Sequence, residues 1–236
     1  MNTTRAQSLA RDRHRDVLVS FLKGCGVAQE DALNIVREVC PGPYDQLSKT
    51  EIADLLLSLV GRGVDDTHPI TYVSVPVTTG RAYLDWCIRH SHDSQRSTNP
   101  AGVVRQEVSE ANRRRARETI KRLRTRLPGI IIDPSSLIDI DSWQQSDYHA
   151  FWLKVIDKYA DRLVFVDGWQ YSVGCTIEFA EAVRVHLPTL TEHCERFDVD
   201  SGLRLVRTAL QEYTAARVDA IPLRRALETA EKAAAA

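Results

Sequence analysis

One stretch of the sequence, residues 163–182, constrains the fold more than any other. It opens with the apolar run Leu-Val-Phe-Val, crosses a polar turn that holds Gly168 and Gly174, and continues with apolar residues at helical spacing. A strand, a turn and a helix in this order place the turn at the carboxyl edge of a sheet, where open α/β folds bind ligands. Glu178 lies about one helical turn beyond Gly174, so we expect its carboxylate near that edge. A first-turn acid favoured by the helix dipole is the alternative interpretation.

The neighbouring segments alternate between strand-like and helical patterns. Residues 70–77 and 129–132 are rich in β-branched residues and are predicted to be buried strands, and a last short strand is expected within 186–191. Helices are predicted over about 103–127 and 146–160, and the polar residues 90–101 are predicted to form a loop. Strands that alternate with helices predict an α/β fold with a parallel sheet.

Helical segments flank this α/β region on both sides. Three short helices are predicted within residues 5–61, and the third begins with the capping-box pair Ser48 and Glu51. Helical spacing returns after residue 200, and Pro222 suits the first turn of a terminal helix. The chain is therefore divided into a helical N-terminal subdomain (1–66), an α/β domain (67–195) and a C-terminal helical extension (196–236).

The charge pattern argues against polyanionic partners. The net charge is −1, and the cationic residues of helix 103–127 alternate with glutamates at spacings that allow helical ion pairs, so a solvated helix face is favoured over a nucleic-acid patch. We expect no nucleic-acid or membrane partner. Five scattered cysteines without a CxxC pair and an N-terminus without a secretory signal favour the cytoplasm.

The turn and its surroundings resemble a known superfamily. Pro76-Val-Thr78-Thr79-Gly80 follows the first strand, Asp133-Pro134 ends the second, and the third leads into Gly168-Trp169-x-x-Ser172-x-Gly174-x-x-x-Glu178. Over residues 70–192 the chain resembles the nucleoside 2-deoxyribosyltransferase-like superfamily, in the branch that has a G-W-x-x-S-x-G-x-x-x-E turn. The resemblance implies a flavodoxin/Rossmann-like parallel sheet, with the N-terminal subdomain and the C-terminal helices outside it.

The resemblance also implies a reaction, the cleavage of the N-glycosidic bond of a nucleoside or nucleotide. Glu178 would be the nucleophile that attacks the anomeric carbon, since a carboxylate stabilises and can trap an oxocarbenium-like species. A second acid would protonate the departing base. Asp167 and Asp133, both at predicted strand ends, are the candidates for that acid, and each could equally be a turn or cap residue.

One position departs from the superfamily pattern. Classical members of the superfamily carry an Asp where this chain has Ser172, and a hydroxyl cannot act as an acid near neutral pH. A hydrolase that holds a 5′-phosphate on Ser172 and the helix amides is therefore an alternative to a deoxyribosyltransferase. The predicted substrate-binding residues are Thr78, Thr79, Gly80, Trp169, Tyr171, Ser172 and Gly174. No cofactor is expected, and no metal, because the histidines are not at ligand spacings and are interpreted as surface or loop residues: His90, His92, His149 and His193.

Two further predictions concern an alternative function and the oligomeric state. The chain could be a non-catalytic module that binds and senses nucleotides, in a phage-defence or conflict system, with the N-terminal helices docking a protein partner. A homo-oligomer is also expected from the resemblance, because relatives complete their pockets with residues of a neighbouring subunit.

Overall fold

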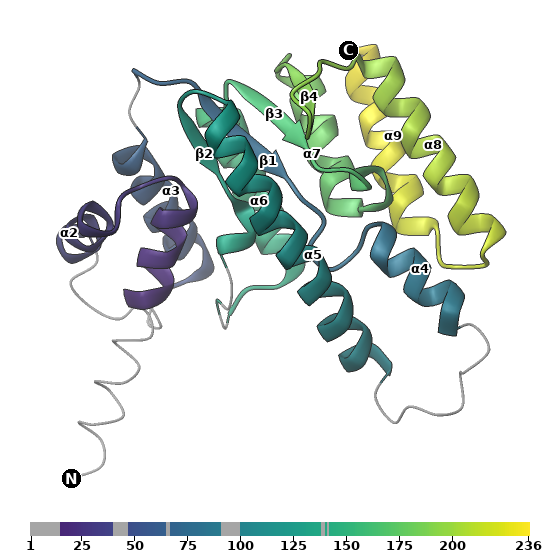
Figure 1. Ribbon diagram of the computed structural model, residues 1–236, viewed down its shortest axis with the longest axis horizontal. Coiled ribbons are helices and arrows are strands. Elements are labelled where there is room, and N and C mark those ends of the chain that lie inside the picture. The colour runs from purple at the N-terminus through teal and green to yellow at the C-terminus, as the bar shows by residue number, and fades with distance from the viewer. Residues whose placement is uncertain (1–14, 40–46, 65–66, 91–99, 138–139, 141) are drawn as a thin grey trace, which may run out of the picture.

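The computed structural model describes residues 15–39, 47–64, 67–90, 100–137, 140 and 142–236. They form a mixed α/β fold in which one sheet is flanked by helices on both faces. In Figure 1 the N-terminal helices lie to the left of the sheet and the C-terminal pair lies to its right.

The sheet has four parallel strands in the order β2-β1-β3-β4. These are β1 (Ile70–Ser74), β2 (Ile130–Ile132), β3 (Arg162–Phe165) and β4 (Thr189–Thr191). Tyr72 of the central strand pairs with Ile132 on one side and with Leu163 on the other. The predicted parallel α/β sheet is thus confirmed, including its short last strand.

Both faces of the sheet are covered, because successive side chains of a strand point to opposite faces. Val73 of β1 packs on one face with Ala116 and Leu123 of helix α5 (Pro100–Arg126). Tyr72 lies on the other face, in the core that includes helices α6 (Gln145–Tyr159) and α7 (Val173–Arg184). The long basic helix and the helix that carries Glu178 therefore lie on opposite sides of the sheet.

The N-terminal helices belong to the same core as α6 and α7. A helix over residues 15–24 precedes α2 (Gln29–Val39) and α3 (Lys49–Gly63), and the predicted capping box at the start of α3 is present. Phe21 of the first helix packs against Phe151 and Trp152 of α6, with ring centroids 5.9 and 6.0 Å apart. The predicted boundary after residue 66 therefore does not separate two cores.

The C-terminal helices are equally integrated. Helix α9 (Ile221–Ala235) packs along α7, and α8 (Val199–Ala215) packs on the 3₁₀ turn η2 (Trp169–Tyr171). Gly202 of α8 allows close packing, since a Cβ atom there would lie 2.3 Å from the Phe179 ring of α7. The aromatic ring of Phe197 also joins the cluster around Trp169. The predicted boundary after residue 195 therefore runs through packed aromatic residues.

Two helical features differ from the predictions. Helix α4 (Arg81–His90) was not predicted, and it follows β1 after the six-residue segment 75–80. Helix α5 begins at Pro100, so the ends of the predicted loop 90–101 are helical, whereas 91–99 lie outside the described residues. Among the described helices, none is long and apolar enough to cross a membrane.

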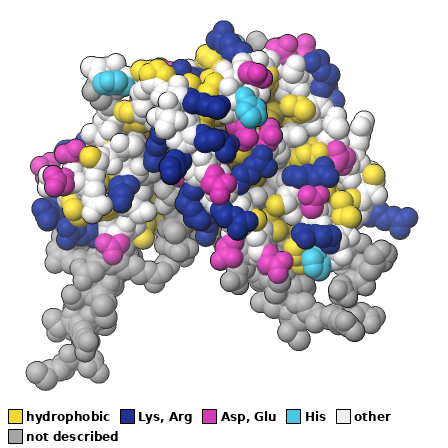
Figure 2. Space-filling model, in the orientation of Figure 1, with side chains coloured by type: hydrophobic (Ala, Val, Ile, Leu, Met, Phe, Trp, Pro, Cys, Tyr) yellow, Lys and Arg dark blue, Asp and Glu magenta, His cyan; other side chains and the backbone are white. Residues whose placement is uncertain are grey.

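The basic helix has a largely solvated outer face, as the alternating charges predict. Figure 2 shows Lys and Arg side chains over the middle of this face of the molecule, where α5 runs in Figure 1. Arg115 lies 3.6 Å from Asp167, Arg122 lies 3.5 Å from Glu192, and Arg124 donates to the carbonyl oxygen of Lys23. Arg115 and Arg122 are thus paired with carboxylates that lie outside α5.

Candidate functional site

A cavity of about 370 Å³ lies at the carboxyl edge of the sheet. Its walls come from the segment after β1 (75–79), the η1 turn after β2 (Pro134–Ser136) and the first turns of α7. Helix α6 contributes Trp152 and His149, and α5 contributes Arg113. The cavity thus occupies the edge at which open parallel sheets bind ligands.

Glu178 lines this cavity and is held by two hydroxyl groups of the central strand. Its carboxylate accepts a hydrogen bond of 2.7 Å from the Tyr72 hydroxyl and one of 2.5 Å from the Ser74 hydroxyl. Tyr72 and Ser74 are two residues apart, so both side chains point to the face of the sheet that α7 covers. The strand therefore positions both oxygens of the acid.

Burial shifts the protonation of this carboxyl group. Removal from water disfavours the charged form and raises the pKa of Glu178 to about 7. The hydroxyls of Ser74 and Tyr72 oppose this change, because they donate to the ionised form. Glu178 is consequently a carboxyl group that changes its charge near neutral pH.

The start of α7 forms the polar wall beside Glu178. Ser172 is the N-cap of the helix, and its hydroxyl oxygen accepts from the amide of Cys175 at 3.4 Å and from the Thr79 hydroxyl at 2.9 Å. Ser172 and Gly174 line the cavity together with Thr78 and Thr79. Hydroxyl groups beside a helix N-terminus suit an anionic or hydroxyl-rich ligand.

The turn after β1 is fixed from the opposite face of the sheet. Asn112 of α5 donates its side-chain amide to the carbonyl oxygens of Val77 and Thr79, at 3.1 and 2.8 Å. These bonds hold the backbone that presents Thr78 and Thr79 to the cavity. Asn112 is therefore a positioning residue that the sequence reasoning missed.

Two further ionisable side chains line the cavity. His149 contacts Gln145 at 3.0 Å, and burial lowers the pKa of its imidazole. Arg113 has a buried Nε atom without a hydrogen-bond partner among the described residues. The interpretation of His149 as a surface or loop residue was wrong, because it lies on a helix and faces the cavity.

The two predicted second acids lie outside the cavity wall. Asp167 is exposed, with 66% of its side-chain surface accessible, and lies near Arg115. Asp133 is buried and caps the η1 turn by accepting from the amide and the hydroxyl of Ser135 at 2.9 and 2.6 Å. Burial raises the pKa of Asp133, but its carboxylate serves this turn. The structure does not bring either residue together with Glu178.

Three predicted substrate-binding residues also lie apart from the cavity lining. Trp169 is buried against Phe165 and Phe179, with ring centroids 4.6 and 5.1 Å apart, and is part of the core. Gly80 ends the turn after β1 with a φ of 92°, a conformation that favours glycine. The third, Tyr171, belongs to a polar network.

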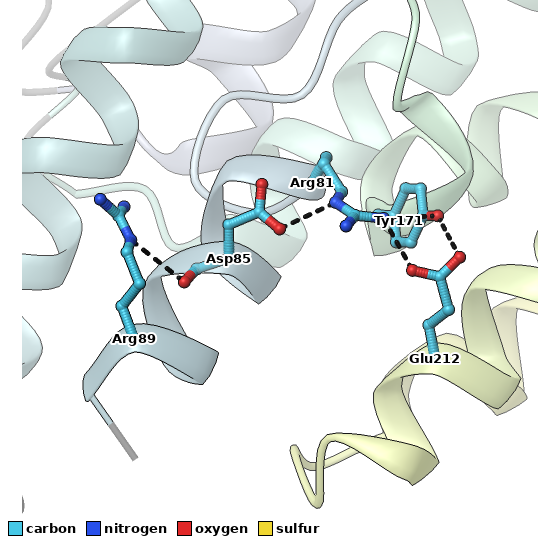
Figure 3. A network of polar contacts seen from close by, with 5 residues as sticks. All are labelled: Arg81, Asp85, Arg89, Tyr171 and Glu212. Carbon is cyan, nitrogen blue, oxygen red and sulfur yellow. Dashed lines mark hydrogen bonds and ion pairs between the residues drawn. The ribbon is translucent and has the colours of Figure 1, made fainter. Parts of the chain in front are cut away.

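Figure 3 shows this network, which joins three helical segments. The Tyr171 hydroxyl donates to Glu212 of α8 at 2.7 Å, and Arg81 of α4 donates to both Glu212 and the Tyr171 oxygen, at 2.7 and 3.0 Å. Asp85 accepts from Arg81 at 2.8 Å. The network holds Tyr171, the residue before Ser172, and so links the cavity wall to α4 and α8.

One group of potential metal ligands is found among the described residues. Ligand atoms of Asp167, Glu192 and His193 lie within 4.8 Å of one another. Arg115 and Arg122 approach Glu192 to 3.7 and 3.5 Å, so guanidinium groups already compensate its charge. This arrangement is better explained as ion pairing than as a metal site.

The sequence contains spacing signals for the site residues that were not predicted. Ser74 is a polar residue two positions after Tyr72 in the same strand, and this spacing could have placed both beside α7. Arg113 precedes the buried Ala116 by three residues and Ile120 by seven, which puts it on the inner side of its helix. His149 precedes the buried Trp152 by three residues and Ile156 by seven, so the same spacing could have placed it on the inner side of α6.

Comparisons of this chain with protein-family models, with curated proteins and with solved structures found no match. The superfamily resemblance therefore stays a prediction.

Proposed function

We propose that this protein cleaves the N-glycosidic bond of a nucleoside or nucleotide, with Glu178 as the nucleophile. The observation that supports it most directly is the hydrogen-bonded Glu178 carboxylate in a cavity at the carboxyl edge of the sheet. The strand order 2-1-3-4 agrees with the first four strands of the flavodoxin-like order, so we also propose that finer fold description.

In this reaction Glu178 attacks the anomeric carbon of the sugar while the bond to the base breaks. The electron pair of that bond leaves with the base, which takes up a proton, and the sugar becomes an ester of Glu178. Water or a second base then takes the sugar and releases the carboxylate. Tyr72 and Ser74 would keep the carboxylate oriented for attack through their hydrogen bonds.

The proton for the departing base has no carboxyl source in the described cavity wall other than Glu178 itself. His149 lines the same cavity and can donate a proton when its imidazole is protonated, a form that its lowered pKa restricts to more acidic pH. We therefore place His149 or a water molecule, in preference to Asp133 or Asp167, in the role of proton donor.

Release of free base tests the proposal. The purified protein would be incubated with deoxynucleosides, ribonucleosides and their 5′-monophosphates, with Glu178→Gln as the inactive variant and Glu228→Gln, an exposed change on α9, as the control. We expect base release by the wild type and the control, and a sugar adduct on Glu178 by mass spectrometry. Identical background for the wild type and Glu178→Gln across the panel would refute the proposal.

A sensing module is the second candidate, and the network around Tyr171 favours it. Because Arg81 and Glu212 join the cavity wall to α4 and α8, ligand binding could be transmitted to the flanking helices. This candidate expects a ligand-induced rise in Tm without product. A homo-oligomer also remains part of the proposal, and light scattering that shows a monomer would remove it.

A further inference from the structure

The Arg113 guanidinium is the least compensated charged group beside the cavity. It lines the cavity from α5, its Nε atom is buried, and the described residues give it no hydrogen bond or ion pair. Other arginines of the same helix do have partners: Arg115, Arg122 and Arg124 each contact a carboxylate, a hydroxyl or a carbonyl oxygen. Arg113 thus differs from them in both burial and pairing.

A buried N–H donor without a partner, such as Nε of Arg113, is costly, because it has lost water and gained no acceptor. Such a group points to a ligand that supplies the missing acceptor oxygens. Arginine suits phosphate especially well, since its planar fork donates two parallel hydrogen bonds to two oxygens. The hydroxyls of Thr79 and Ser172 and the start of α7 line the same cavity and also suit phosphate.

We propose that Arg113 binds the phosphate of a nucleoside 5′-monophosphate and so makes the cavity selective for nucleotides over nucleosides. The identity of the sugar and base rests on the proposed function. Known small-molecule pockets span about 300–1,000 Å³, so a cavity of about 370 Å³ suits one mononucleotide better than a dinucleotide.

Glu178 and Arg113, the two oppositely charged residues that line the cavity, do not bond to each other. The carboxylate of Glu178 is bonded to Tyr72 and Ser74, and Arg113 is not among its partners. Glu178 is therefore free to face the anomeric carbon while Arg113 holds the phosphate. A direct ion pair between Glu178 and Arg113 would have left neither side chain available to the sugar or the phosphate.

Isothermal titration tests this assignment without depending on turnover. The ligands are inorganic phosphate, a deoxynucleoside panel and the matching 5′-monophosphates, each titrated into wild type, Arg113→Gln and Arg114→Gln. Arg114 is an exposed neighbour on the same helix, so its variant loses the same charge outside the cavity. Tm without ligand checks that each variant is folded, and Arg113→Lys tests whether charge alone is sufficient.

We expect the wild type and Arg114→Gln to bind 5′-monophosphates at least about tenfold more tightly than nucleosides, and Arg113→Gln to lose this preference while still binding nucleosides. Equal preference in Arg113→Gln and wild type, or nucleoside binding without any preference for the phosphate, would overturn the assignment and leave the proposed function standing. Arg113-dependent binding of phosphate without any nucleotide binding would support the anion site but refute the proposed function. Absence of binding to every ligand would overturn both.

Discussion

Glu178 combines two properties that a structural acid seldom has together. Burial disfavours its charge, yet both carboxylate oxygens accept hydrogen bonds that favour that charge. The pKa of about 7 is the result of this opposition. Such a carboxyl group is charged, as attack on a sugar requires, above about pH 7 and is neutral at lower pH.

The raised pKa predicts how stability depends on pH. The folded state favours protonated Glu178, so its contribution to stability is complete below the unfolded-state pKa of about 4.5 and is lost as the pH rises to about 7. The loss is about 3 kcal/mol. Glu178→Gln is neutral at every pH, so we expect its Tm to exceed that of the wild type at pH 8 and to match it at pH 4. The control Glu228→Gln should follow the wild type, and a constant Tm difference across this range would contradict the assignment.

The hydroxyl of Ser74 predicts how activity depends on pH. Its hydrogen bond lowers the pKa of Glu178, so Ser74→Ala should move the rise of kcat/KM to higher pH. We expect about a tenfold loss of activity at pH 6 and a much smaller loss at pH 9. Ser20→Ala, which removes an exposed hydroxyl outside the cavity lining, serves as the control. An equal loss at both pH values would show that Ser74 acts by packing alone.

At the scale of elements, α7 is positioned by the segments on either side of it. The turn before it is fixed by Tyr171 and its partners on α4 and α8, and its inner face packs on α9 and on the sheet. Gly168 makes the sharp exit from β3 possible, because its φ of 83° is a conformation that other residues rarely adopt. The placement of Glu178 therefore depends on the C-terminal helices as well as on the strand–turn–helix itself.

The close contact of α8 with α7 can be tested by one methyl group. Gly202→Ala would place a carbon 2.3 Å from the Phe179 ring, so the buried ring or the helix must shift. We expect a loss of about 1–3 kcal/mol in the free energy of unfolding, measured by urea denaturation. Leu205→Ala removes more atoms from the same helix but at an exposed position, so it should cost less than about 0.5 kcal/mol. A smaller cost for Gly202→Ala than for Leu205→Ala would contradict the packing.

The sequence predicts the elements of this fold better than the contacts of its site. Periodicity identifies the strands and the capping box because these depend on neighbours a few residues apart. The Tyr72–Glu178 bond joins residues 106 positions apart, and no local pattern encodes it. Trp169 shows the same limit, because an aromatic residue after a strand can face either a ligand or the core, and only the cluster with Phe165 and Phe179 decides.

At the scale of the whole molecule, the three predicted units share one hydrophobic core. Phe21 packs on Trp152, whose ring lies 5.8 Å from that of Tyr72, and Tyr72 in turn donates to Glu178. Trp152 also lines the cavity. The N-terminal helices are therefore connected to the candidate site through packed aromatic rings, and they contribute to the α/β region from which they are separated in sequence.

This connection predicts that a change in the N-terminal helices affects the cavity. Phe21→Ala removes a fully buried ring and should lower the free energy of unfolding by about 3–5 kcal/mol. Since Trp152 loses support, we also expect weaker ligand binding at temperatures where the variant is still folded by near-UV circular dichroism. Ser20→Ala, an exposed change on the same helix, should alter neither property. If Phe21→Ala lowered Tm but left binding unchanged, the N-terminal helices would stabilise the chain without supporting the site; if it left Tm unchanged, the shared core itself would be refuted.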